Sequence, residues 1–245
     1  MNKEQVAAGA ELANDTSKIE VRTTADGSPT LYVPALDEHY HSHHGAAQES
    51  RHVFIEAGLR PLLAAGKGQP GTDPIHLLEV GLGTGLNALL TLEATQAAGA
   101  RLVYYGYEAV PLSPAIVAAL APQWEKTPLL QQAFQKLHVT AGDRMETLAP
   151  DFWLIKRLVQ LETAPLPIGY FDLIYFDAFA PEKQPELWTE DVFAKLYAAA
   201  APGAVLVSYC AQGQFRRNLR AAGWLTEKLP GPPGKREMTR ARKPA

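Results

Sequence analysis

A glycine-rich stretch in the first half of the chain limits the fold more than any other feature. Residues 77–87 read Leu-Leu-Glu-Val-Gly-Leu-Gly-Thr-Gly-Leu-Asn, an apolar run that breaks into three alternate glycines. The residues that follow, 87–92, suit a helix. A strand, a glycine turn and a helix in this order form the first half of a βαβ unit. The glycines let the backbone turn tightly, and the helix N-terminus offers free N–H groups to a polar or anionic ligand.

The spacing of the glycines separates two kinds of nucleotide site. A dinucleotide fingerprint, G-x-G-x-x-G, needs a glycine at position 86, which is Leu86. The pattern that is present, E-x-G-x-G-x-G from Glu79 to Gly85, resembles the first motif of class I S-adenosylmethionine methyltransferases. A purely structural βα turn is the alternative at this point.

Apolar strands and helices alternate along the rest of the chain. Strands are predicted at 75–80, 101–108, 136–141, 170–177 and 204–209, and helices at 53–65, 86–99, 111–121, 148–161, 186–199 and 212–222. This order predicts a doubly wound α/β fold with a mostly parallel sheet and helices on both faces. We expect one domain over residues 19–242, with an N-terminal β-hairpin and an antiparallel edge hairpin at its C-terminal end, after a flexible arm of residues 1–18.

Three carboxylates directly follow predicted strands: Glu108, Asp143 and Asp177. In a doubly wound sheet, ligands bind beyond the carboxyl ends of the strands. Glu108 lies 23 residues beyond Gly85, a separation that suits an acceptor for the ribose hydroxyls, and Asp143 suits an adenine amino group. Each acid has an alternative role as a helix N-cap. Together with the glycine turn, the three acids predict a nucleoside ligand.

The segment that begins at Asp177 predicts amine chemistry. Phe179 and Pro181 follow the acid at two and four residues. An amine attacks a sulfonium methyl group only with a free lone pair, so it must first lose its proton. Asp177 can take that proton or orient the amine, and its charge offsets the positive charge beside a sulfonium. We expect Phe179 to stack on the acceptor ring, with packing in the core as the alternative.

The charge of the chain is divided unevenly. The net charge is −3, but residues 216–245 contain nine Lys and Arg against two Glu, so this part carries +7 and the rest −10. The asymmetry predicts a polyanionic partner for the C-terminal part, with a solvated basic tail as the alternative. The single Cys210 excludes an intrachain disulfide and fits a reducing compartment. With no apolar run of bilayer length and no signal-peptide pattern, we expect a cytoplasmic protein without a membrane partner.

Five of the seven histidines lie between His39 and His52. His39, His41 and His43 alternate, so they share one face of an extended chain. No cysteine or second ligand cluster accompanies them, and we therefore expect a loop that lines a cleft and no metal site.

Several longer segments resemble one family. They are Tyr40-x-Ser42, Glu49-Ser50-Arg51-x-Val53-Phe54, Glu79 to Asn87, Glu108-x-x-Pro111-Leu112, Gly142-Asp143, Phe176 to Thr189, and Gly234-Lys235-Arg236-Glu237-Met238. Together they are similar to the MnmC-type tRNA methyltransferases, the aminomethyl-2-thiouridine methyltransferase domain, over about residues 19–242. The histidine-rich loop and the prolines Pro232 and Pro233 depart from that pattern.

The resemblance implies a function and a set of site residues. The activity would be S-adenosylmethionine-dependent N-methylation of the 5-aminomethyl group of a wobble uridine in tRNA, with the anticodon stem-loop held by the basic C-terminal region and no DNA. Cofactor contacts would come from Glu79, Gly81, Gly83, Gly85, Asn87, Glu108, Asp143 and Asp177, catalysis from Asp177 and Phe179, and acceptor contacts from Tyr40, Ser42, Pro181, Lys235, Arg236 and Glu237. Many relatives fuse this domain to an FAD-dependent oxidoreductase, and this chain is expected to be the methyltransferase part alone.

Two other functions fit parts of the same pattern. An aminopropyltransferase of the polyamine-synthase kind would share the glycine turn and Glu108, but a basic C-terminal part disfavours a polyamine acceptor. A non-catalytic RNA-binding domain would have no use for three acids at one edge of the sheet.

Overall fold

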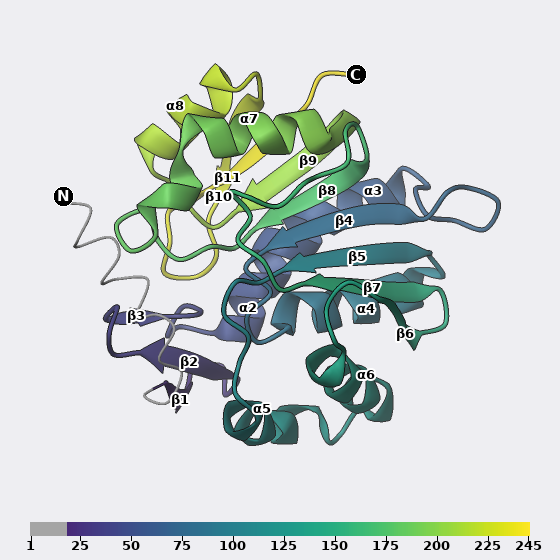
Figure 1. The fold of residues 1–245 in the computed structure, drawn as a ribbon, viewed down its shortest axis with the longest axis vertical. Helices are drawn as coiled ribbons and strands as arrows, with labels where there is room; N and C mark the ends of the chain where they lie inside the picture. The colour runs from purple at the N-terminus through teal and green to yellow at the C-terminus, as the bar shows by residue number, and fades with distance from the viewer. Residues whose placement is uncertain (1–18) are drawn as a thin grey trace.

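The computed structural model describes residues 19–245, so the arm predicted at residues 1–18 lies outside the described residues. An eight-stranded sheet with the order β10-β11-β9-β8-β4-β5-β7-β6 forms its centre (Figure 1). The strands are β4 (Ile75–Val80), β5 (Leu102–Tyr107), β6 (Met145–Ala149), β7 (Phe152–Arg157), β8 (Phe171–Phe176), β9 (Ala200–Ser208), β10 (Leu225–Pro230) and β11 (Glu237–Arg242). The five central strands, β9, β8, β4, β5 and β7, are parallel to one another. Strand β11 is antiparallel to β9, and β6 is antiparallel to β7. The predicted doubly wound α/β fold is confirmed.

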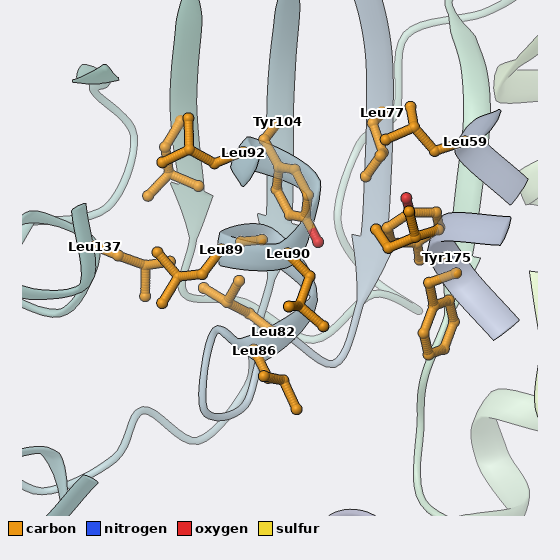
Figure 2. Close-up of a cluster of buried hydrophobic side chains, with 14 of the residues drawn as sticks. Leu59, Leu77, Leu82, Leu86, Leu89, Leu90, Leu92, Tyr104, Leu137 and Tyr175 are labelled. Atoms are coloured by element: carbon orange, nitrogen blue, oxygen red, sulfur yellow. The ribbon is translucent and has the colours of Figure 1, made fainter. Parts of the chain in front are cut away.

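Helices cover both faces of this sheet (Figure 1). They are α4 (Leu86–Ala98), α5 (Pro114–Leu120), α6 (Pro128–Val139), α7 (Glu190–Ala199) and α8 (Gly213–Ala221), with short 3₁₀ turns η3 (Ala121–Trp124) and η4 (Pro185–Trp188). Alternate residues of a strand face opposite layers. On one face, Tyr175 of β8 belongs to a buried cluster that also contains Leu89 and Leu92 of α4 (Figure 2). Phe176 packs with Phe193 on the other face.

The order of the strands reverses between β4 and β8. From β4 the chain builds β5 and then β7 on one side, and it returns to build β8 and β9 on the other. The parallel register sets Val80 opposite Phe176, and the Asp177 N–H donates to the Val80 carbonyl at 3.0 Å. The glycine turn and Asp177 therefore begin side by side, at the point where ligands bind in such sheets.

The N-terminal part of the described chain forms a separate small sheet. Strands β1 (Glu20–Thr23) and β2 (Pro29–Val33) are the predicted hairpin, to which β3 (Glu38–His39) adds a short third strand. One unbroken helical segment follows, α2 (Ala46–Ser50), a π-helical stretch η2 (Arg51–Leu59) and α3 (Arg60–Ala64). It begins seven residues before the predicted start at Val53, and Glu49 lies buried inside it.

The predictions for residues 136–161 are wrong. Residues 136–141 alternate in hydrophobicity, which favoured a strand, but α6 continues to Val139. Its buried residues, Leu130, Ala133, Phe134 and Leu137, recur at helical spacing, and tertiary packing on the sheet follows that period. Residues 148–161, predicted as a helix, contain most of the strand pair β6 and β7. The alternation of buried and partly exposed side chains along β7 is that of a strand.

The antiparallel hairpin predicted at the C-terminal end is present as β10 and β11 at one edge of the sheet. Its connecting loop, residues 231–236, returns toward the carboxyl ends of the parallel strands. Gly234 in that loop lies against the ring of His44, so close that no side chain would fit there. The histidine-rich loop and the loop between β10 and β11 thus meet. No helix among residues 19–245 is long and apolar enough to cross a membrane.

Candidate active site

A cavity of about 640 Å³ lies at the carboxyl ends of β4, β5 and β8. Its walls come from the glycine turn after β4, the residues after β5 and β8, the histidine-rich loop and the loop between β10 and β11. Sites for cofactors and small substrates have volumes of about 300–1,000 Å³. The cavity is therefore large enough for a nucleoside cofactor and part of an acceptor.

The glycine turn approaches its neighbours too closely for side chains. Gly81 and Gly83 have φ of 87° and 49°, in the left-handed region that favours glycine. A Cβ at Gly81 would lie 2.5 Å from the Asp177 carbonyl oxygen, and one at Gly83 would lie 3.0 Å from the Tyr40 ring. Gly85 instead packs on Leu137 of α6 and does not line the cavity. Gly81 and Gly83 thus form part of the cavity wall, whereas Gly85 lets the start of α4 pack against α6.

Glu108 ties the end of β5 to this turn. Its Oε2 accepts from the Gly83 N–H at 2.9 Å and its Oε1 from the Val110 N–H at 2.8 Å. Burial raises the pKa of Glu108, although these hydrogen bonds favour the ionised form. Because the carboxylate lines the cavity, it can hold the turn and still accept from hydroxyl groups of a ligand.

Asp177 lies at the centre of the cavity wall and shares a buried amide with a second acid. Asn87, in the first turn of α4, donates from Nδ2 to Asp177 Oδ2 and to Glu79 Oε1, both at 2.8 Å. Burial raises the pKa of Asp177 to about 7, against the effect of this hydrogen bond. Glu79 is fully buried behind Asn87 and does not line the cavity. An acid with this pKa can accept a proton from an amine near neutral pH.

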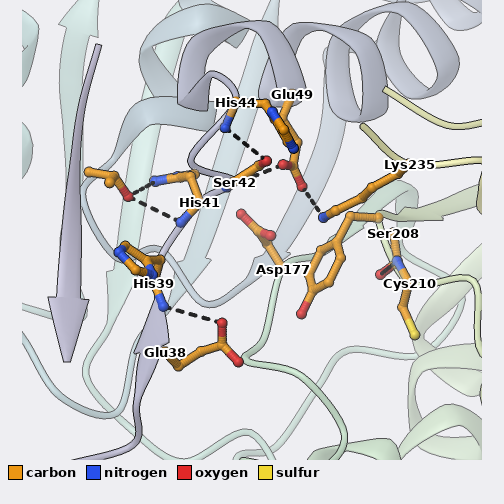
Figure 3. Close-up of polar contacts among 12 residues, drawn as sticks. Glu38, His39, His41, Ser42, His44, Glu49, Asp177, Ser208, Cys210 and Lys235 are labelled. Atoms are coloured by element: carbon orange, nitrogen blue, oxygen red, sulfur yellow. Dashed lines mark hydrogen bonds and ion pairs between the residues drawn. The ribbon is translucent and has the colours of Figure 1, made fainter. Parts of the chain in front are cut away.

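Lys235 closes the cavity from the C-terminal side. Its Nζ lies 2.7 Å from Oε1 of Glu49 and 4.4 Å from the centre of the Tyr209 ring. Figure 3 shows this lysine reaching to Glu49 beside Asp177. The Ser42 N–H donates to the other oxygen of Glu49 at 3.2 Å. The pair thus joins the loop after β10 to the N-terminal helix, next to the candidate base.

Aromatic rings form another wall of the cavity. Phe179 is only partly buried and meets the ring of Tyr40 edge-on, with centroids 5.1 Å apart. The Trp188 indole N–H donates to the Phe179 carbonyl at 2.8 Å and fixes the loop. Both rings line the cavity.

Other predicted site residues lie elsewhere. Asp143 lies in the turn before β6, where its exposed carboxylate pairs with Arg157, and it does not line the cavity. Asp143 was expected to follow a strand at residues 136–141, and because that strand does not form, the expected position is wrong as well. Pro181, Arg236 and Glu237 line a smaller hollow that shares Lys235 with the cavity. Glu49 and Tyr209 also line the cavity but were not predicted as site residues, since only the folded chain brings them to Asp177.

The histidine-rich loop lines the cavity, as expected. His41 is held by Thr30, whose Oγ1 lies 3.3 Å from Nδ1, and burial lowers the pKa of His41 to about 4. His41 is therefore neutral at physiological pH. Among residues 19–245, no group of three or more His, Cys, Asp or Glu is arranged to hold a metal ion.

A glycine turn after the first parallel strand, a buried carboxylate after the second and a candidate base at the switch point define a nucleoside-cofactor enzyme of the class I methyltransferase fold. A family model described as S-adenosyl-L-methionine-dependent methyltransferase matches residues 114–244, more than half of the chain. The chain belongs to this family, which confirms the cofactor class.

Individual relatives agree with this assignment. Over 240 residues the chain is 31% identical to the tRNA 5-methylaminomethyl-2-thiouridine biosynthesis bifunctional protein MnmC of Cupriavidus metallidurans, covering 89% of this chain and 33% of that protein. The protein of the same name from Magnetococcus marinus is 36% identical over 220 residues, 86% of this chain and 32% of that protein. The chain thus spans about a third of the length of these curated relatives.

Solved structures show the same fold. The crystal structure of MNMC2 from Aquifex aeolicus superposes with a TM-score of 0.73 at 24% identity, over 100% of this chain and 80% of that chain. Spermidine synthase from Thermotoga maritima superposes with a TM-score of 0.53 at 14% identity, over 92% and 68%.

Proposed function

We propose that this chain methylates the primary amine of a 5-aminomethyl group on a wobble uridine of tRNA, in the cytoplasm. The observation that carries the proposal is the buried Asp177, with a pKa raised to about 7 by burial, between an aromatic wall and the glycine turn. The relatives named for 5-methylaminomethyl-2-thiouridine biosynthesis supply the acceptor.

The residues at the glycine turn fit S-adenosylmethionine. Glu108 presents a carboxylate to the cavity at the end of β5, where a ribose would lie in this fold. Gly81 and Gly83 line the cavity with it, and without side chains their backbone can come close to a ligand. Asn87 Oδ1 is buried and has no partner among residues 19–245, so it is available to a donor on the ligand. When bound, S-adenosylmethionine supplies a methyl group on a sulfonium.

Asp177 would act on the acceptor amine. Its Oδ2 is held by Asn87, and Oδ1 has no hydrogen-bond donor among the described residues. An ammonium group that enters the cavity can give its proton to Asp177, which frees the lone pair for attack. The rings of Tyr40 and Phe179, which line the cavity, would hold the uracil while this occurs.

Replacing Lys235 with methionine should move the pH dependence of catalysis. The positive charge of Lys235 lowers the pKa of Asp177, whereas the negative charge of Glu49 raises it. Without Lys235 the pKa of Asp177 rises, so the acid limb of the kcat/KM profile should move up by about 0.5–1 pH unit. Lys228→Met on the same hairpin removes an exposed lysine that does not line the cavity. A Lys235→Met profile that coincides with that of Lys228→Met would contradict the assignment.

The tRNA is proposed to lie on the basic surface beside the cavity mouth. Much of the C-terminal charge is already paired, since Arg216 meets Glu237, and Arg240 meets Glu227. Arg217 and Arg236 are exposed and form no ion pair with the described residues, and Arg236 lines the hollow next to the cavity. These two guanidinium groups are therefore free for phosphates of the anticodon stem-loop.

The double variant Arg217→Glu/Arg236→Glu should weaken tRNA binding at least tenfold. The slope of log K against log salt should become shallower by about 0.7–0.9 for each lost phosphate contact. Binding is measured by titration at several salt concentrations, with Arg60→Glu on α3 as the control for an exposed arginine away from the cavity. An unchanged slope would place the tRNA on another surface.

A further inference from the structure

The buried side of the site contains an acid that no ligand in the cavity can touch. Glu79 is 0% exposed on β4 and lies behind Asn87. The side chains that face it are Asn87 from α4, Asp177 after β8, Tyr104 of β5 and, at longer range, Glu108. No lysine, arginine or histidine among residues 19–245 pairs with it.

No cation among the described residues offsets a negative charge on Glu79. Burial and the charge of Asp177 raise the pKa of Glu79 well above its ordinary value, whereas the pKa of Asp177 is about 7. A proton that remains on Glu79 while Asp177 ionises leaves one negative charge in the pair. Oε2 of Glu79 and the hydroxyl of Tyr104 are buried atoms without a hydrogen-bond partner among the described residues, and each of the two side chains affects the pKa of the other.

The amide of Asn87 can satisfy both acids in one orientation only. An amide has two N–H donors on nitrogen and one acceptor oxygen. Both donors are engaged, one on Glu79 and one on Asp177. With the amide reversed, its oxygen would face the Asp177 carboxylate, and two acceptors would oppose each other in a buried site. A group that fixes the orientation of the Asn87 amide therefore also fixes the hydrogen bond from Asn87 to Asp177, and this bond favours the ionised form of Asp177.

We propose that Glu79 is a positioning residue for Asp177: in its protonated form it anchors one N–H of Asn87, and so holds the other N–H on the base. Glu79 thereby acts through Asn87 and not on the cofactor. The proposal rests on the proposed function, in which ionised Asp177 accepts the proton of the amine.

Four variants test this inference: Glu79→Gln, Glu79→Leu, Asn87→Ala and the double variant Glu79→Leu/Asn87→Ala. Glutamine is neutral and keeps the acceptor, so kcat and the pH profile should stay within about threefold and 0.3 pH unit of the wild type. Leucine has no acceptor, so kcat should fall about tenfold and the acid limb should move to higher pH. In the Asn87→Ala background Glu79→Leu should cost nothing further, because the residue through which it acts is gone.

Three outcomes would overturn the inference. Glu79→Gln could lose as much activity as Glu79→Leu at unchanged Tm and cofactor affinity, which would mean that an ionised carboxylate is needed. Alternatively, the losses of activity caused by Glu79→Leu and by Asn87→Ala could add in the double variant, which would mean that Glu79 does not act through Asn87. Wild-type protein that transfers no methyl group to amine-bearing tRNA would instead overturn the proposed function. A readout independent of activity separates the two: infrared difference spectra should contain a protonated carboxyl band at neutral pH that Glu79→Gln removes. Absence of that band from the wild type would also overturn the inference.

Discussion

Replacing Asp177 with asparagine should slow methyl transfer by about 10²–10⁴-fold, the usual contribution of a general base. Asparagine keeps the shape of the side chain and loses only the ability to take a proton from the amine. Glu108 and the glycine turn are untouched, so the affinity for S-adenosylmethionine should change by less than about threefold. Single-turnover transfer to amine-bearing tRNA and a titration with the cofactor measure the two effects separately.

The same substitution should not reduce stability. The folded-state pKa of Asp177 is raised by burial from its ordinary value of 3.8 to about 7, so this carboxyl lowers stability progressively as the pH rises from about 4 to about 7, and the full cost remains above pH 7. That cost is absent at low pH, where the acid is protonated in both states, and asparagine removes it at high pH. We therefore expect the Tm of the variant to equal or exceed that of the wild type at pH 8.

Asp172 at the opposite end of β8 provides a matched control. It pairs with Lys67 at 3.0 Å and accepts from the His76 N–H, away from the cavity. Asp172→Asn should remain active and lose about 1 kcal/mol or less of stability. Activity of Asp177→Asn within tenfold of the wild type would remove Asp177 from the mechanism.

Gly81→Ala should both abolish tight cofactor binding and destabilise the protein. Alanine at a φ of 87° costs about 1–2 kcal/mol, and its Cβ would lie 2.5 Å from the Asp177 carbonyl oxygen, a backbone atom that cannot move freely. With the added overpacking, a total loss of about 2–5 kcal/mol is expected. The displaced turn should weaken S-adenosylmethionine binding at least tenfold.

The Gly71→Ala variant separates the free-energy cost of a positive φ from the cost of the steric clash that Gly81→Ala also causes. Gly71 has a φ of 89°, almost equal to that of Gly81, but nothing lies within 4 Å of an added Cβ. This variant should lose only about 1–2 kcal/mol and bind the cofactor normally. Denaturant titration and calorimetry measure both quantities. Equal losses in the two variants would mean that the close approach between Gly81 and Asp177 has no energetic role.

The sequence predicted the parts of the site that follow strands within one βα unit. The glycines after β4 and the acids Glu108 and Asp177 are found by such local patterns, and the fold confirms the switch point between β4 and β8. Asp143 was misplaced because residues 136–141 alternate in hydrophobicity while packing on the sheet imposes a helix. A local pattern cannot decide between a strand and a helix when the sequence fits both the two-residue period of a strand and the 3.6-residue period of a helix.

The remaining part of the site depends on contacts far apart in the sequence. Glu49 and Lys235 are separated by 186 positions, and nothing near either residue indicates that they pair. The same holds for Asn87, whose contact with Asp177 spans 90 positions. Glu79 was expected to touch the cofactor because it opens the glycine motif, but its strand position turns the side chain into the core.

Transfer of labelled methyl from S-adenosylmethionine to tRNA tests the central claim most directly. The assay compares tRNA with 5-aminomethyl-2-thiouridine at the wobble position against the same tRNA with unmodified uridine. We predict label on the first tRNA only, with 5-methylaminomethyl-2-thiouridine as the product nucleoside. Label on neither tRNA, by protein that binds the cofactor, or equal label on both, would contradict the proposed function.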